Sequence, residues 1–247
     1  MIEPIAVPTD GPARAVFTTR AGGVSRGPYE GLNLGASTGD RPADVRENRR
    51  RVCERLALDG ERVTMNHQVH GADLRRVDAP TRPGRFLGGL RAWPQADGLA
   101  TERPGLALVV LGADCLSVLL WRRDRPAVAA AHAGWRGLVA GVVERAAAAL
   151  GDPARTAAAV GPGVGPCCYP TGAEVRAAFA ARFGEEVVHA PAVDLAAAAR
   201  RALVAAGVPQ SQVSVVPGCT SCEAERFFSH RRDGAASGRQ AGLVWIP

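Results

Sequence analysis

Three residues with metal-binding side chains stand out, because each ends a short apolar stretch inside a dense polar motif. They are His70 in Asn-His-Gln-Val-His-Gly, Cys115 in Gly-Ala-Asp-Cys, and His132 in Ala-His-Ala-Gly-Trp-Arg-Gly. Two imidazoles and one thiolate suit zinc, and catalytic zinc sites use three protein ligands and leave a fourth position for water or substrate. The sequence therefore predicts an enzyme with an open zinc site.

The spacing of these residues is a weak signal by itself. Cys115 and His132 are far enough apart to be joined by one hairpin, and the paired ligands of a zinc finger do not occur. A buried cysteine with two hydrogen-bonded histidines explains the pattern equally well. His67 would point away from His70 in an extended segment, which does not favour it as a fourth ligand.

The residues after His132 predict a site for an anion. Gly134 is expected to open a helix whose first N–H groups have no partner within the helix, and Arg136 would add a planar pair of donors. A tight turn with an exposed Arg136 is the competing interpretation. Arg20, in a glycine-rich loop over residues 19–35, is a second candidate for binding phosphate.

Two chemistries remain open for the catalytic step. A zinc enzyme that activates water needs a carboxylate acid or base, and Asp114 and Asp73 are the candidates, with backbone capping as their alternative role. The H-x-E…P-C-x-x-C signature of zinc deaminases is absent. In a metal-free cysteine hydrolase, Cys115 would be the nucleophile and His132 the base.

Composition excludes several classes of protein. The 247-residue chain is 47% hydrophobic, enough for a substantial core, and it has no apolar run of membrane-spanning length. No signal peptide pattern is present, so six cysteines indicate free thiols or metal ligands and a cytoplasmic location. All 30 basic residues are Arg. Without Lys, the chain has neither a Walker A loop nor a Schiff-base lysine.

The net charge gives only a weak indication of the ligand. A net charge of +6 fits an anionic ligand such as phosphate, whereas scattered Arg and 5% aromatics do not favour nucleic acid. We expect a monomer or weak homodimer acting on small molecules.

Cys219 and Cys222 form a C-x-x-C without a thioredoxin-like frame, which favours local packing. Cys167 and Cys168 are adjacent, and we expect both to be reduced thiols.

The hydrophobic pattern predicts the elements that position these residues. Continuous apolar runs predict buried strands at residues 106–111, 116–121 and 127–131. Shorter apolar runs predict further strands at residues 15–18, 213–216 and 243–246. Helices are expected over 135–150, 173–183 and 194–206, and another from Pro42 with Val45, Val52 and Leu56 on one face. Strands and helices mix without strict alternation. This indicates a layered, mixed-sheet α/β or α+β fold, with one domain over 1–247.

Seven motifs together resemble those of a known family. They are Thr19-Arg20-x-Gly-Gly-Val-Ser, Leu32-Asn33-Leu-Gly35, Gln68-Val-His70-Gly71, Ala113-Asp114-Cys115, His132-Ala-Gly-Trp-Arg-Gly137, Gly161-Pro-x-x-Gly165 and Phe227-Phe-Ser-x-Arg-Arg-Asp233. In this order they resemble the YfiH family, often labelled laccase-domain or multicopper polyphenol oxidase proteins. Almost the whole chain is covered. His230 departs from the tyrosine that the family more often has before the Arg pair.

The resemblance implies a fold, a metal and an activity. It implies an αββα sandwich, which a Rho-deamidating bacterial toxin shares, with zinc on residues that correspond to His70, Cys115 and His132. It implies purine nucleoside phosphorylase activity on adenosine, inosine and methylthioadenosine, an adenosine deaminase side reaction and, for some members, peptidoglycan-precursor editing. With Arg20, we expect Asn33, Gln68 and Gly134 to bind substrate or phosphate, and Asp114 and Arg136 to act in catalysis.

The copper-oxidase label conflicts with the number of histidines. A laccase holds four copper ions, mostly on imidazoles, and this chain has five His in all. We therefore expect no four-copper chemistry, and at most an adventitious copper ion in the zinc site.

Overall fold

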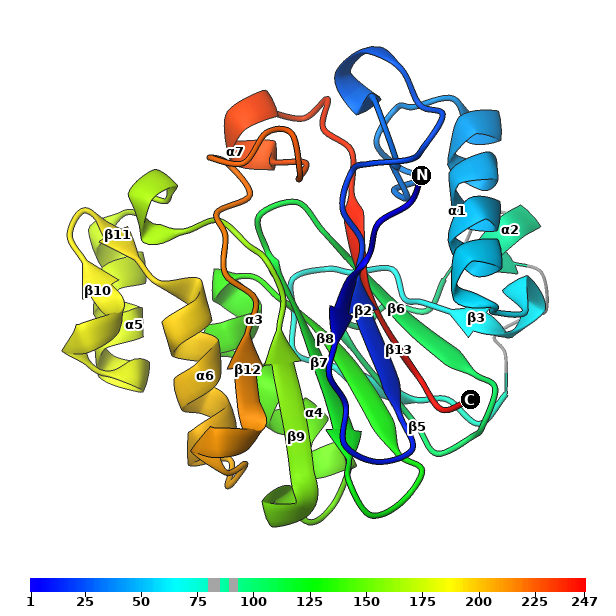
Figure 1. Ribbon diagram of the computed structural model, residues 1–247. Coiled ribbons are helices and arrows are strands. Elements are labelled where there is room, and N and C mark those ends of the chain that lie inside the picture. Colours follow the sequence, from blue (N-terminus) through cyan, green and yellow to red (C-terminus); the bar gives the residue numbers. More distant parts are fainter. Residues whose placement is uncertain (80–84, 89–92) are drawn as a thin grey trace.

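Two β-sheets lie face to face at the centre of the molecule, and helices cover the outer face of each sheet (Figure 1). The computed structural model describes residues 1–79, 85–88 and 93–247. The layers follow the order helix, sheet, sheet, helix, with apolar clusters between successive layers. This arrangement confirms the predicted α+β class and the layered sandwich of mixed sheets.

The first sheet brings the two ends of the chain together. Its strand order is β1-β2-β13-β6-β3. The strands are β1 (Ile5–Val7), β2 (Arg14–Phe17), β3 (Val63–Thr64), β6 (Ala107–Gly112) and β13 (Gln240–Trp245). The pairs are antiparallel except for β3 with β6, which is parallel. The last strand, β13, therefore lies between the N-terminal strand β2 and the central strand β6.

The second sheet carries His132 on β8, and Cys115 directly precedes its strand β7. Its order is β12-β9-β7-β8-β5-β4, with parallel pairs at both edges and antiparallel pairs between them. The strands are β4 (Leu74–Arg76), β5 (Gly98–Thr101), β7 (Leu116–Arg122), β8 (Val128–Ala133), β9 (Thr156–Val160) and β12 (Val213–Val215). A separate pair consists of β10 (Val188–His189) and β11 (Ala192–Val193).

The helices divide between the two outer faces (Figure 1). The first sheet packs against α1 (Pro42–Leu56) and α2 (Arg85–Gly88), and α7 (His230–Asp233) precedes β13. The helices on the side of the second sheet are α3 (Trp135–Val139), α4 (Val142–Ala149), α5 (Ala173–Phe183) and α6 (Leu195–Ala205). In the described part of the chain, no helix is both long and apolar enough to cross a bilayer.

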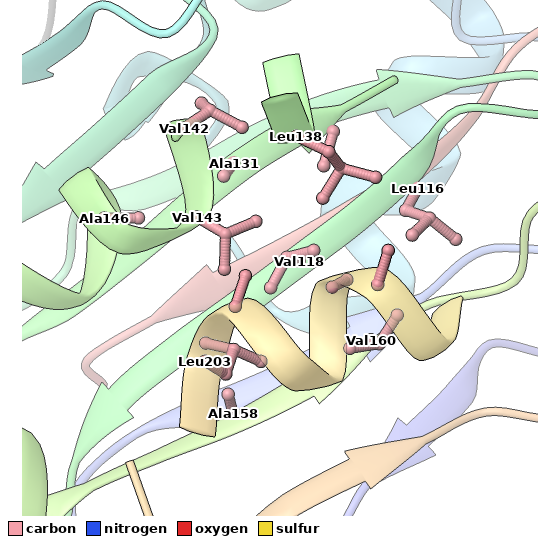
Figure 2. Close-up of a cluster of buried hydrophobic side chains, with 14 of the residues drawn as sticks. Leu116, Val118, Ala131, Leu138, Val142, Val143, Ala146, Ala158, Val160 and Leu203 are labelled. Carbon is pink, nitrogen blue, oxygen red and sulfur yellow. The ribbon is translucent and has the colours of Figure 1, made fainter. Parts of the chain in front are cut away.

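Burial of both faces explains the continuous apolar runs in the central strands. Figure 2 shows Val118 and Ala131 of the second sheet facing Val143 of α4 and Leu203 of α6. The alternate residues of the same strands point toward the first sheet, as Leu119 does. Strands covered on both faces show no polar alternation. The three central strands predicted from these runs correspond to β6, β7 and β8, and their bounds differ from the predicted ones by one or two residues.

The predicted helix over 135–150 is wrong in one respect, because it is two helices. The first, α3, ends at Val139, and α4 begins at Val142. Gly141 between them has a φ of 86°, in the left-handed region. Glycine adopts this conformation without steric cost, which allows the chain to change direction there. The five-residue α3 next to the candidate site is therefore separate from the longer helix that covers the sheet.

Candidate metal site and cavity

Three metal-binding side chains meet at one end of the sandwich. The Sγ of Cys115 and one ring nitrogen from each of His70 and His132 lie within 4.8 Å of one another. The two imidazole rings meet edge to face, with 4.9 Å between their centroids. Zinc bonds of about 2.0–2.3 Å place bound N and S atoms at about 3.3–3.8 Å from one another, so small side-chain rotations suffice to bind one ion. The three predicted ligands therefore form a site that could hold a metal.

Strand register explains why Cys115 meets His132. In the antiparallel pair β7–β8, Ser117 lies opposite His132 and Leu116 opposite Ala133. Cys115, just before β7, is therefore next to Gly134, just after β8. A Cβ atom on Gly134 would lie only 2.8 Å from the Cys115 Sγ. The absence of a side chain at this position makes room for the thiol.

His70 is held in place by a carboxylate that the sequence analysis missed. His70 has a φ of 62°, a left-handed conformation that costs a non-glycine residue about 1–2 kcal/mol. The backbone N–H groups of Val69, His70 and Gly71 donate to the carboxylate of Asp97 at 3.1, 3.0 and 2.8 Å. These three hydrogen bonds offset the strain and fix the loop that presents His70.

The same carboxylate orients His132. The Nδ1 of His132 lies 2.8 Å from Oδ1 of Asp97, whose side chain is 0% exposed. Metal-bound histidines commonly donate their second ring N–H to a carboxylate, which fixes the tautomer and makes the imidazole a stronger ligand. With Nδ1 bound to Asp97, Nε2 of His132 is free to face a metal. Asp97 thus supports two of the three ligands.

The electrostatics of the site favour a thiolate. Burial raises the pKa of Cys115, but the charge and hydrogen bonds of His132 and His70 outweigh it and lower that pKa to about 6. Burial lowers the pKa of His132, whereas Cys115 and Asp97 raise it to about 9. Before metal binding, the stable form near neutral pH is therefore a thiolate beside an imidazolium. The thiolate is the form of cysteine that binds metal ions.

A cavity of about 1080 Å³ opens beside the three ligands. Small-molecule sites commonly measure about 300–1,000 Å³, so this one has room for a nucleoside-sized ligand. Among the lining residues that the structure describes, the charged, imidazole and phenol side chains outside the metal set are Arg49, His67, Asp114, Tyr169, His230, Arg231 and Arg239. Three arginines and one carboxylate make the lining positively charged.

Asp114 is in the cavity lining, but its carboxylate is already engaged. Its Oδ1 accepts a hydrogen bond from the Thr220 hydroxyl at 2.7 Å, and its Oδ2 accepts one from the backbone N–H of Arg231 at 2.5 Å. Asp114 also has a left-handed φ of 88° at the turn from β6 to β7. These contacts give Asp114 an anchoring role next to Cys115. The other candidate base, Asp73, is 86% exposed, pairs with Arg145 and lies outside the lining.

Asn33 and Gln68 hold the backbone around the site. Buried Asn33 accepts hydrogen bonds from the N–H groups of Gly35 and Arg239 at 2.9 and 2.8 Å. Gln68 lines the cavity, and its amide donates to the carbonyl of Leu111 and accepts from the N–H of the same residue, at 2.7 and 2.8 Å. Asn33 therefore positions Arg239, and Gln68 joins the His70 loop to β6.

The two arginines chosen from the sequence do not line the cavity. Arg136 is exposed, and its guanidinium lies over the ring of Trp135, 4.5 Å from the centroid. Arg20 donates to the carbonyl oxygens of Glu30 and Ala224. The interpretation of Arg136 as an exposed residue in a tight turn fits this placement better than a role in anion binding.

Sequence reasoning missed four residues around the site. Asp97 precedes a glycine, as many turn aspartates do, and nothing in its neighbourhood marks it as a ligand support. Arg231 lies in the Phe227–Asp233 motif but was given no role, and Arg239 is one of 30 arginines, so residue type could not single it out. Tyr169 is one of only two tyrosines, which was the single available signal. Its ring lies 5.1 Å from the Arg231 guanidinium.

Replacing Gly134 by Ala is expected to disturb the metal-binding set without unfolding the protein. The added methyl group would lie 2.8 Å from the Cys115 Sγ and 3.4 Å from Cδ2 of His70, so at least one of these side chains must move. Metal content after dialysis should fall in this variant. The matched control is Gly71→Ala, whose methyl group would meet only ordinary contacts at 3.6 and 3.7 Å. Equal metal retention in both variants would contradict this geometry.

Comparison with known proteins identifies the family. Residues 14–247 match the family model described as multi-copper polyphenol oxidoreductase laccase. A purine nucleoside phosphorylase of Streptomyces coelicolor is 45% identical, over 93% of this chain and 94% of its own length. The purine nucleoside phosphorylase YfiH of Escherichia coli is 39% identical, over 94% of this chain and 93% of its own length.

Solved structures agree with the sequence comparisons. The crystal structure of YlmD from Geobacillus stearothermophilus superposes with a TM-score of 0.90 and 36% identity, covering 97% of this chain and 94% of that one. The crystal structure of the Bacillus licheniformis hypothetical protein YfiH has a TM-score of 0.88 and 30% identity, covering 95% of this chain and 93% of that one. The chain therefore belongs to the laccase-like family of YfiH and YlmD proteins, as its motifs indicated.

Proposed function

We propose that this protein is a zinc-dependent purine nucleoside phosphorylase acting on adenosine, inosine and methylthioadenosine, with adenosine deamination as a side reaction. The observation that carries the proposal is the His70–Cys115–His132 set beside a large cavity lined by arginines. Relatives at 38–45% identity that are named purine nucleoside phosphorylases support the reaction class.

Zinc is the metal that best fits the ligands. Two imidazoles and one thiolate give a mixed nitrogen and sulfur set with a fourth position left for substrate or water, which is the usual form of catalytic zinc sites. A bound zinc would act as a Lewis acid and lower the pKa of a water molecule, the chemistry that deamination requires. His70, Cys115 and His132 would hold the ion, and Asp97 would orient His132.

Phosphate is assigned to Arg239 and Arg231 in place of Arg136 and Arg20. Arg239 lines the cavity and is half-buried; burial lowers its pKa, and the charges of Asp114 and Cys115 offset only part of this shift. Its Nη1 donates to the carbonyls of Ser237 and Gly238. No hydrogen bond of Nη2 is resolved within the part of the chain that the structure describes, which leaves an edge for an anion. Arg231 lines the same cavity, and its Nη2 donates to the carbonyl of Pro170 at 2.9 Å.

The reaction joins a phosphate oxygen to the anomeric carbon and breaks the bond from that carbon to the purine nitrogen. The products are ribose 1-phosphate and the free base, which takes up a proton. The arginines would hold and align the phosphate against the anomeric carbon. Asp114 would position Arg231 through its hydrogen bond to the backbone N–H. Two further histidines, His67 and His230, line the cavity but do not belong to the metal-binding set.

Replacing Arg239 by Gln is expected to raise the KM for phosphate by about tenfold to a hundredfold, because charged hydrogen bonds contribute about 1.5–3 kcal/mol. The KM for the nucleoside and the zinc content should change little. The matched control is Arg136→Gln, which removes a guanidinium outside the cavity and should stay within about twofold of wild type. Initial rates at varied phosphate measure both constants. A larger effect in Arg136→Gln than in Arg239→Gln would show that phosphate binds at Arg136 on α3 instead.

The direct test of the proposed function is the dependence of base release on phosphate. Adenosine is incubated with the protein in phosphate-containing and phosphate-free buffer, and adenine, inosine and ribose 1-phosphate are separated. The proposal expects ribose 1-phosphate to match adenine release, and both to stop without phosphate. Inosine formation, which uses water, should continue. Equal adenine release in both buffers would assign the protein as a nucleoside hydrolase.

The family label of a multi-copper oxidase does not suit the ligands of this chain. Four copper ions need many imidazoles, whereas the chain has five histidines. In the described structure, two of these join the metal-binding set, while His189 is exposed on β10. We therefore assign no four-copper oxidase activity to this protein.

One observation favours a cysteine hydrolase as a second candidate. Cys115 contacts His132, and His132 pairs with Asp97, which is the arrangement of a nucleophile, a base and an orienting carboxylate. His70 has no role in such a triad but completes a metal site, so the metal enzyme accounts for more of the geometry. Alkylation by iodoacetamide discriminates between them. A zinc-bound thiolate is protected until a chelator is added, whereas a free nucleophile reacts at once.

A further inference from the structure

Four cysteines from two distant parts of the chain gather outside the cavity. Cys167 and Cys168 lie in a single 3-10 turn over Pro166–Cys168, and Cys219 and Cys222 lie in the loop after β12. Their four Sγ atoms all lie within 4.8 Å of one another, and all four thiols are free. Neither pair gave a reason in the sequence to join it to the other, because some fifty residues separate them.

The sulfur positions match a tetrahedral thiolate site. The Sγ of Cys222 lies 3.6 Å from that of Cys167 and 3.4 Å from that of Cys168. Four sulfurs at about 2.3 Å from a central zinc ion are separated by about 3.8 Å. Cys219-x-x-Cys222 also has the spacing with which paired cysteines bind structural zinc.

The surrounding backbone leaves room for the four sulfur atoms and donates a hydrogen bond to one of them. The N–H of Gly165 donates to the Cys219 Sγ at 3.2 Å. A Cβ on Gly165 would lie 3.3 Å from the Cys167 Sγ and 3.6 Å from the Cys219 Sγ, so glycine permits this close approach. Hydrogen-bonded support around the ligands is a usual feature of metal sites.

We propose that Cys167, Cys168, Cys219 and Cys222 bind a second zinc ion, in a closed structural site. None of the four lines the cavity, so this site is separate from the His70–Cys115–His132 set. Four protein ligands leave no open position, which is typical of structural rather than catalytic zinc.

The second zinc would stabilise one wall of the cavity. Tyr169 of the cavity lining directly follows Cys168. Thr220, between Cys219 and Cys222, donates its hydroxyl hydrogen bond to Asp114. Joining the two loops through a metal therefore fixes Tyr169 and Asp114, and through Asp114 the backbone of Arg231. The proposed ion acts on the shape of this wall and takes no part in the reaction.

The test is metal stoichiometry in four proteins purified under reducing conditions. We expect about two zinc equivalents per chain in wild type and about one in Cys115→Ala, which keeps only the four-cysteine site. Cys222→Ser should also lose one equivalent. Its matched control is Ser221→Ala, which changes the neighbouring side chain and should keep two.

The nature of the remaining site is measured on Cys115→Ala loaded with cobalt. A tetrathiolate site gives strong thiolate-to-cobalt charge-transfer absorption and the visible bands of tetrahedral cobalt. Absence of metal from Cys115→Ala would overturn the proposal, as would disulfides among the four cysteines after alkylation and mass analysis. This result needs no nucleoside turnover, so it is independent of the proposed function. It also stands if Cys222→Ser fails to fold.

Discussion

Replacing Asp97 by Asn is expected to weaken metal binding at the His70–Cys115–His132 site by about tenfold to a hundredfold, the usual effect of losing an outer partner of a ligand. Each carboxylate oxygen of Asp97 faces two donors: Oδ1 faces His70 N–H and His132 Nδ1, and Oδ2 faces Val69 and Gly71 N–H. An Asn side chain would turn an NH₂ group toward one of these pairs. The free energy of unfolding should fall by about 3 kcal/mol, as when a buried charged pair is broken.

Asp73→Asn is the matched control for this substitution. The Asp73 carboxylate is exposed and, among the interactions that the structure describes, pairs only with Arg145, so both metal affinity and stability should stay close to wild type. Competition with a chromophoric chelator measures the affinity, and urea denaturation measures the stability. Unchanged metal affinity in Asp97→Asn would mean that neither histidine depends on this carboxylate.

Replacing Cys115 by Ala is expected to remove one equivalent of metal and to reduce phosphorolysis to background. The variant leaves two imidazoles, and the loss of the thiolate also removes the negative charge that raises the pKa of His132. The pKa of His132 falls as a result, which leaves its imidazole neutral, but two imidazoles are one ligand short of the three that catalytic zinc sites use. Elemental analysis beside the rate of ribose 1-phosphate formation gives both readouts.

The control for Cys115→Ala is Cys53→Ala. Cys53 is buried among the apolar residues between α1 and the first sheet and belongs to neither of the described metal-binding groups. This variant should be less stable than wild type but should keep its metal and its activity. A Cys115→Ala protein that retained the full metal content would refute the assignment of the ligands.

The sequence predicted the central part of the fold because its strands are covered on both faces. Runs such as residues 116–121 have the length of a strand and are too short for a typical buried helix. The strand β9 was missed because Thr156–Val160 consists mainly of alanines, which are common in helices. The break between α3 and α4 was missed because Gly141 continues an apolar helical pattern, and only the tertiary structure requires its left-handed conformation.

The site was predictable where residue types were rare and unpredictable where they were common. With only five histidines and six cysteines in the chain, His70, Cys115 and His132 were conspicuous after short apolar stretches. Arg136 was chosen for its position at a helix start, but its side chain turns outward over Trp135. Asp97 and Arg239 act through long-range contacts, to the His70 loop and to Asn33, which no local pattern records.

The source of the oxygen atom on the ribose product tests the central claim most directly. Adenosine is cleaved in heavy-oxygen water with unlabelled phosphate, and the sugar product is analysed by mass spectrometry as it forms. Attack by phosphate at the anomeric carbon predicts ribose 1-phosphate that carries no label from water. Free ribose labelled at the anomeric position would show attack by water and would contradict the assignment of this protein as a phosphorylase.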